Sequence, residues 1–123
     1  MYYKQSASTD PIEFKEVHDG HGFIKRRNLF GSLSKLPIGL EIWELEQGVS
    51  EGPHNHNDTE VLEEVYYFLK GTGIMTIDGE EVPVETGDAI MITPESARGI
   101  INTGAESLKL AIIWGAPTLL DGK

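Results

Sequence analysis

The chain has 123 residues, with 20 acidic and 10 basic side chains, a formal net charge of −10 and no cysteine. This length predicts one domain, and the lack of cysteine excludes a disulfide framework, a thiolate nucleophile and an iron–sulfur cluster. The acidic balance argues against nucleic acid and anionic membranes as partners. The apolar run Leu110–Trp114 is far shorter than the roughly 18 residues of a membrane span. The N-terminus lacks a signal-peptide pattern, so a cytoplasmic address is expected.

A short helix is expected first, over Thr9–Val17, because Asp10 can cap it and Pro11 suits its first position. After residue 22, short runs of alternating or β-branched residues are separated by turn clusters, and Asp78-Gly79 is typical of a tight hairpin. This pattern predicts an all-β sandwich or barrel. The expected strands are Gly22–Arg27, Ile38–Glu46, Val61–Leu69, Ile74–Ile77, Glu81–Val84, Ala89–Ile92, Arg98–Ile101 and Leu108–Trp114.

Two histidines one residue apart, His54 and His56, follow a Gly-Pro turn. On an extended segment, residues two apart face the same side, so both imidazoles can converge on one point. Two imidazoles and a carboxylate from the same hairpin would suit Fe, Mn, Ni, Co or Zn. The alternative is a polar loop whose His, Asn and Asp residues simply favour turns.

The residues around this pair extend the pattern, and they are Gly48, Glu64, Gly71, Gly87, Pro94 and Asn102. With them the sequence resembles the cupin superfamily, whose first motif is Gly, five residues, His-x-His, three or four residues, Glu, six residues and Gly. The resemblance implies a double-stranded β-helix, or jelly-roll barrel, with a small-molecule pocket and a metal inside. A single domain of residues 1–123 is expected, with the conserved barrel at about 39–114 and peripheral segments at 1–21 and 117–123.

The spacing after the histidines departs from the family pattern. Seven residues, rather than three or four, separate His56 from Glu64. Glu60 fits the short spacing, whereas Glu64 fits the spacing to Gly71. Glu64 is the preferred metal ligand because the loop before it absorbs an insertion easily, with Glu60 and Glu63 as alternatives.

Arg98 stands where the family's second motif carries its last metal-binding histidine. A guanidinium has no lone pair and cannot bind a metal. In one arrangement His54, His56 and Glu64 still hold the metal, and Arg98 clamps an anionic substrate. In another, Arg98 pairs with Glu64 in a metal-free pocket. In a third, a register slip points Arg98 to solvent.

Further candidates come from alternation and from a second histidine pair. If Glu64 points inward, Tyr66 and Phe68 do so too. The Tyr66 hydroxyl could then act as an acid, a base or a hydrogen-bond donor, or could simply line the barrel. His18 and His21 could cap the barrel mouth or supply the missing ligand.

These features and the resemblance predict a metal-dependent enzyme acting on a small carboxylate-bearing metabolite. His54, His56 and Glu64 would hold one divalent transition metal (Fe, Mn, Ni, Co or Zn), with Arg98 orienting the carboxylate and Tyr66 transferring a proton. A dioxygenase, lyase, decarboxylase or isomerase would each be compatible. The alternatives are a metal-free binding or accessory protein with a degenerate site, and a metal-independent acid–base enzyme. The ligand is expected to be anionic and the chain to form a homodimer.

Overall fold

The computed structural model describes residues 1–55 and 61–117, and within these residues the chain is all-β. None of its described segments forms a helix that is long and apolar enough to cross a membrane. The strands are β1 (Glu13–Lys15), β2 (Ile24–Asn28), β3 (Ile38–Leu45), β4 (Ser50–His54), β5 (Glu63–Lys70), β6 (Thr72–Ile77), β7 (Glu80–Glu85), β8 (Ala89–Ile92), β9 (Arg98–Asn102) and β10 (Leu108–Gly115).

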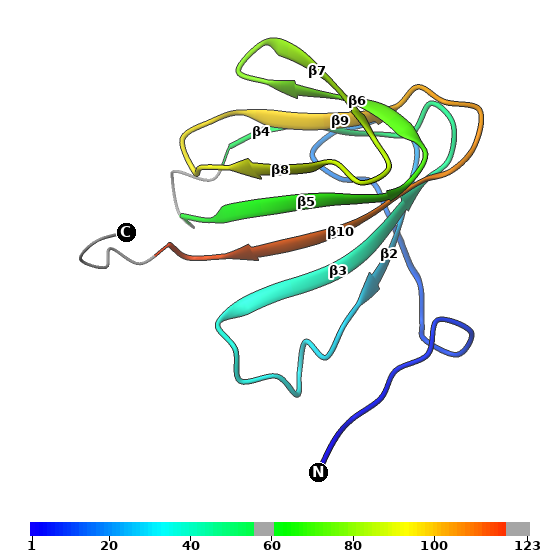
Figure 1. Cartoon of the computed structure of the whole chain (residues 1–123), viewed down its shortest axis with the longest axis vertical. Coiled ribbons are helices and arrows are strands. Elements are labelled where there is room, and N and C mark those ends of the chain that lie inside the picture. Colours follow the sequence, from blue (N-terminus) through cyan, green and yellow to red (C-terminus); the bar gives the residue numbers. More distant parts are fainter. Residues whose placement is uncertain (56–60, 118–123) are drawn as a thin grey trace.

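The strands form two antiparallel sheets that face each other (Figure 1). One sheet has six strands in the order β1-β2-β3-β10-β5-β8, and the other has four in the order β4-β9-β6-β7. Strands that follow one another in the chain often lie in opposite sheets, as in a jelly roll. The all-β barrel predicted from the sequence is therefore confirmed.

Alternation along the central strands builds the core between the sheets. On β10, Leu108, Leu110 and Ile112 are at most 1% exposed. On β5, Tyr66 and Phe68 are fully buried, whereas the intervening Tyr67 is exposed. The inward orientation predicted for Tyr66 and Phe68 is confirmed, and it follows from the two-residue period of a strand.

Two expectations about the elements were wrong or incomplete. The segment Thr9–Val17 forms no helix, because residues 13–15 pair with β2 as the edge strand β1. Tertiary pairing thus overrides the local capping pattern. Strand β4, which contains Pro53, was not among the expected strands. This proline lies at an irregularity of the ladder, where its missing N–H is tolerated.

Candidate metal centre

A bulge in β4 turns two polar side chains toward the barrel interior. Glu51 lies opposite Ile100 of β9, and His54 lies opposite Arg98, so three steps on β4 match two on β9. In a regular strand, residues three apart would point to opposite faces. The extra residue in the bulge brings Glu51 and His54 to the same side.

A loop from the N-terminal part of the chain lies against this bulge. The Gly52 N–H donates to the Val17 carbonyl at 3.1 Å. A Cβ on Gly52 would lie 1.7 Å from the carbonyl oxygen of His18, so only glycine permits this approach. The contact places the imidazole of His18 on that of His54, with ring centroids 3.5 Å apart and an interplanar angle of 12°.

The three side chains brought together here can hold a metal ion. One ligand atom each from His18, Glu51 and His54 lies within 4.8 Å of the other two. His54 Nε2 is 3.7 Å from Glu51 Oε2. Imidazole nitrogens and a carboxylate oxygen suit divalent transition metals, so the donor set fits the kind of metal that the sequence predicted.

The structure places the predicted ligands in three ways. His54 belongs to the group just described, and Glu64 Oε1 is 3.9 Å from His54 Nε2. Alternation puts Glu63 on the opposite face of β5 from Glu64. His56 and the alternative ligand Glu60 lie outside the described residues, so their part in the site stays a prediction.

Arg98 is fully buried and forms an ion pair with Glu64, with 3.0 Å between its Nε and Glu64 Oε1. Its Nη1 donates to the Ser96 carbonyl at 2.8 Å. The arrangement in which a register slip points Arg98 to solvent is therefore wrong. Because Arg98 lies on β9 and Glu64 on β5, the pair connects the two sheets across the barrel interior.

Tyr66 positions Glu51, since its hydroxyl donates to Glu51 Oε1 at 2.8 Å. Burial raises the pKa of Glu51 to about 8, although the hydrogen bond from Tyr66 works in the opposite direction. Burial and the nearby Glu51 carboxylate also raise the pKa of Tyr66 well above its usual value. Tyr66 therefore keeps its proton at neutral pH and serves as a hydrogen-bond donor to Glu51.

These groups adjoin a cavity of about 190 Å³. Its walls combine apolar and aromatic side chains with a few polar groups, the usual composition of a small-molecule site. The lining residues are Val17, His18, Arg26, Trp43, Glu51, Leu62, Glu64, Ile112 and Trp114. Arg98 and Tyr66 do not line the cavity themselves. Arg98 contacts the lining residue Glu64, and Tyr66 contacts the lining residue Glu51.

Other positions of the sequence motif have structural roles. Gly71 has a φ of 91° where β5 turns into β6, a conformation that favours glycine. Asn102 is buried, and its Nδ2 donates to the carbonyls of Leu45 at 2.8 Å and Glu106 at 2.9 Å. Its Oδ1 accepts from the Gly104 N–H at 2.8 Å, which closes the turn before β10.

Residues 41–114 match the protein family described as a cupin domain. The chain belongs to the cupin family. This cupin is 37% identical over 115 residues to an oxalate-binding protein of Thermotoga maritima, covering 89% of this chain and 90% of that protein. It is 31% identical over 108 residues to the dimethylsulfoniopropionate lyase DddW of Ruegeria pomeroyi, covering 86% of this chain and 62% of the lyase. It is also 42% identical over 57 residues to an uncharacterized protein of Methanocaldococcus jannaschii, covering 46% of this chain and 43% of that protein.

A solved structure has the same barrel. The crystal structure of a predicted oxalate decarboxylase from Thermotoga maritima superposes with a TM-score of 0.81 and 24% identity, covering 91% of this cupin and 97% of that chain. At this identity the likeness shows the fold alone. The family match confirms the predicted membership of the cupin superfamily, and the superposition confirms the jelly-roll fold.

Two residues of the site were missed by sequence reasoning. Glu51 lies three residues before His54, a spacing that brings side chains together only if the strand is bulged. Arg26 was not singled out as a pocket residue, although it lies two residues after the fully buried Ile24 and so shares its face of β2. His18 was considered as a possible ligand, and its position beside His54 supports that alternative.

Proposed function

We propose that this cupin binds one divalent transition metal ion through His18, Glu51 and His54, and acts as an enzyme on a small carboxylate-bearing metabolite. The observation that carries the proposal is that these three donor groups lie within 4.8 Å of one another beside a small cavity. The relatives support an anionic ligand, because one is named an oxalate-binding protein and another a lyase of a propionate compound.

The charges around the proposed metal favour an anionic ligand. The two buried carboxylates, Glu51 and Glu64, stand against one divalent ion and the guanidinium of Arg98. The centre then carries one net positive charge in a poorly solvated pocket, where charges interact more strongly than in water. Arg98 contributes by compensating Glu64, which would otherwise repel a carboxylate.

When bound, the metal would supply a Lewis acid or an oxygen-activating centre. Tyr66 would hold the Glu51 carboxylate in place through its 2.8 Å hydrogen bond. His54 lies on β4, and His18 lies on the loop that packs against Gly52, here called the docked loop. The site therefore joins a loop to the barrel wall. The proton-transfer role predicted for Tyr66 and the ligand roles of His56 and Glu64 remain part of the proposal; Glu64 would have to leave Arg98 to bind the metal.

Elemental analysis of the untagged protein, purified without chelator, tests the metal site. We expect close to one equivalent of a transition metal in the native protein and its loss in Glu51→Gln and His54→Ala. The control His21→Ala, which changes a histidine of the same loop, should keep the metal. Glu64→Gln tests the ligand role of Glu64 separately: loss of the metal assigns Glu64 to the site, and retention excludes it as a ligand. Native protein that holds no metal after reconstitution with Fe(II), Mn(II), Co(II), Ni(II) or Zn(II) would contradict the proposal.

Turnover tests the enzymatic part separately. Metal-loaded protein is incubated with oxalate or dimethylsulfoniopropionate, the compounds in the relatives' names, and with other small carboxylates, and the substrate is followed by NMR. We expect one of them to be consumed, with turnover lost on chelation and restored by metal. Turnover that survives chelation would favour the metal-independent acid–base enzyme instead.

A second function is favoured by one specific contact. The 3.0 Å ion pair between Arg98 and Glu64 is the arrangement expected of a metal-free binding or accessory cupin. In that case the native protein binds a small anion without metal, and Arg98→His creates a metal affinity that the native chain lacks. Tight metal binding by the native protein would eliminate this second function.

A further inference from the structure

We infer that Arg26 recognises the carboxylate of the ligand, at the place where the inner cavity meets an outer groove. This inference rests on the proposed function and adds the residue that selects the ligand. No motif of the sequence pointed to Arg26. Its position follows from the pairing of β2 with β3.

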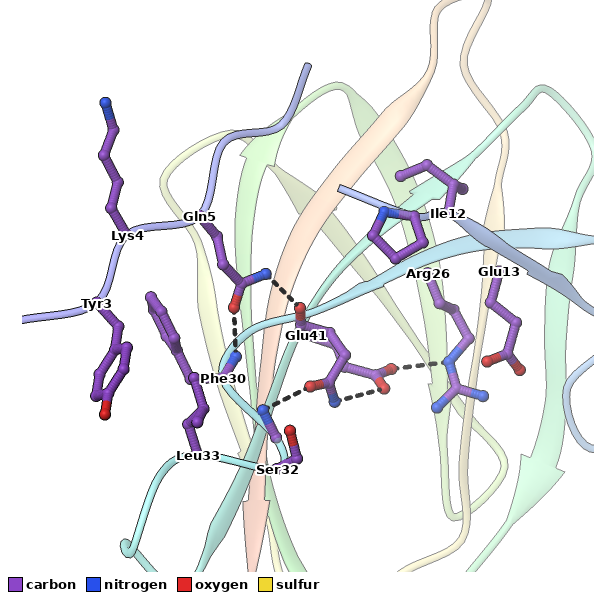
Figure 2. Close-up of a pocket in the computed structure, with 13 residues that line it drawn as sticks. Tyr3, Lys4, Gln5, Ile12, Glu13, Arg26, Phe30, Ser32, Leu33 and Glu41 are labelled. Carbon is purple, nitrogen blue, oxygen red and sulfur yellow. Dashed lines mark hydrogen bonds and ion pairs between the residues drawn. The ribbon is translucent and has the colours of Figure 1, made fainter. Parts of the chain in front are cut away.

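Arg26 lines two neighbouring hollows of the protein. It shares the inward face of β2 with Ile24 and lies opposite Trp43 on β3. From there it contributes to the wall of the 190 Å³ cavity that contains His18 and Glu51. It also lines an outer groove of about 630 Å³ between the N-terminal segment and the connection from β2 to β3 (Figure 2). A ligand that enters the cavity through this groove must pass Arg26.

The guanidinium of Arg26 is held in one orientation by its neighbours. Its Nε donates to Glu41 Oε1 at 2.8 Å, and its charge lies 5.4 Å from the ring centroid of Trp43. The same Glu41 oxygen accepts from Trp43 Nε1 at 2.8 Å. Burial opposes the charge of Glu41, but these hydrogen bonds outweigh it, so that the pKa of Glu41 is lowered and the carboxylate persists.

The terminal nitrogens of Arg26 remain accessible to a ligand. Within residues 1–55 and 61–117, only its Nε makes a hydrogen bond. Figure 2 shows the Nε side turned toward Glu41, with both terminal nitrogens beyond it. The side chain is 19% exposed, whereas that of Arg98 is 0% exposed. A fixed guanidinium with a free edge is suited to a bidentate contact with a carboxylate.

The other charged groups near Arg26 leave this role open. Glu13 lies opposite Arg26 on the edge strand β1, but its side chain is 65% exposed and it is 4.0 Å from Lys15. Glu51 and Glu64 line the same cavity, but Glu51 belongs to the proposed metal centre and Glu64 pairs with Arg98. A ligand carboxylate at the terminal nitrogens of Arg26 would therefore meet a cation whose Nε, on the opposite side, is already paired with Glu41.

The geometry indicates the class of ligand. One end would be a carboxylate on Arg26, and the other an oxygen group facing His18, Glu51 and His54. Between them, the rings of Trp43 and Trp114 offer an apolar surface for a short carbon skeleton. This describes a small acid with a second oxygen function, such as a short dicarboxylate.

Calorimetric titration of the Mn(II)-loaded protein tests the inference. The probes are oxalate, malonate and succinate, each compared with its monoamide. The variants are Arg26→Lys, which keeps the charge but loses the planar edge, and Arg26→Gln combined with Glu41→Gln, which leaves no buried carboxylate without its partner. Arg27→Gln is the control, because Arg27 is the next residue, pairs with Asp10 at 2.9 Å and does not line the cavity.

We expect the best-bound diacid to lose roughly tenfold or more in affinity in both Arg26 variants and to keep its affinity in Arg27→Gln. The native preference for the diacid over its monoamide should also disappear, which a merely structural role of Arg26 would not cause. Metal content is measured on the same samples and should stay constant. Equal diacid affinity in native protein and Arg26 variants, or no binding of any diacid to native protein, overturns the inference.

The failure of the proposed metal site is distinguishable from the failure of this inference. If the native protein holds no metal, the proposed metal site is wrong, and the titration is repeated on the metal-free protein. A loss of diacid affinity in the Arg26 variants then still supports the inference. Equal affinity overturns it there too.

Discussion

Two arginine–glutamate pairs lie on the inner side of this barrel, and they differ in what they connect. Arg98 and Glu64, the inner pair, belong to different sheets and are 0% and 7% exposed. Arg26 and Glu41, the outer pair, lie on neighbouring strands of one sheet and are 19% and 9% exposed. The same chemistry therefore joins the two sheets in one place and borders the cavity in the other.

The difference shows why an arginine at a motif position is not by itself a ligand site. Arg98 stands where a functional residue was expected, but it is fully buried, pairs with Glu64 and the Ser96 carbonyl, and does not line the cavity. Arg26 stands outside every motif and has nitrogens left for a ligand. Burial decides between the two, because a ligand does not reach a fully enclosed ion pair, whereas a pair that borders a cavity can contact a third partner.

The largest expected effect is on stability, and it separates the two pairs directly. Arg98→Met removes the ion-pair partner of a buried carboxylate and should lower the free energy of unfolding by about 3–5 kcal/mol. Arg26→Met should lower it by only about 1–2 kcal/mol, since Trp43 still donates to Glu41. Urea unfolding of the metal-free proteins measures both. Equal losses would show that the pairs do not differ in this way.

The second prediction concerns a substitution that displaces the loop containing His18 and leaves both arginine–glutamate pairs in place. In Gly52→Ala the new methyl group would meet the His18 carbonyl at 1.7 Å, so the loop must move and carry His18 away from His54. We expect the metal affinity to fall about 10- to 100-fold, as for the loss of a supporting group. A competition assay with a fluorescent chelator measures it. His18→Ala should show a similar loss, and unchanged affinity in both variants would remove His18 from the site.

Tyr66→Phe sharpens the comparison at a third buried carboxylate, Glu51, which is held by a hydroxyl rather than by an arginine. Loss of the 2.8 Å hydrogen bond should lower the free energy of unfolding by about 1–2 kcal/mol. Tyr67→Phe is the matched control, because Tyr67 is exposed on the other face of β5. Urea unfolding measures both variants, and an equal response would show that the Tyr66 hydroxyl stabilises nothing.

The most gradual effect expected is a dependence of stability on pH. Burial raises the pKa of Glu51 from 4.5 to about 8, so between these values the folded metal-free protein binds more protons than the unfolded chain. Its stability should therefore fall as pH rises through this range, by at most about 1.4 kcal/mol per pH unit. Glu51→Gln should have a flatter profile in urea unfolding. A native profile that rises over this range would contradict the shift.

Much of the fold could be predicted from the sequence, because strand alternation is a local property. The two-residue period placed Glu64, Tyr66 and Phe68 on the inner face, and burial confirms it. The helix expected over Thr9–Val17 failed because the capping pattern ignores the pairing of β1 with β2. The homodimer and the cytoplasmic address stay predictions.

The site was harder to predict because it depends on irregular backbone and on distant contacts. Glu51 reaches His54 only through a bulge, and no pattern of residue types marked where it would occur. His18 reaches the same point through the close approach of its loop to Gly52. Arg98 could be placed in the barrel from the motif, but its ion pair with Glu64 was one of three open arrangements.

The docked loop has a consequence for exchange kinetics. Of the three proposed ligands, Glu51 and His54 are fixed on β4, while His18 lies on a loop held by backbone contacts such as Gly52 to Val17. Opening such a loop requires far less free energy than separating two sheets. We therefore expect the ion to enter and leave on the timescale of loop opening, and a barrel that unfolds slowly can still equilibrate quickly with metal in its surroundings.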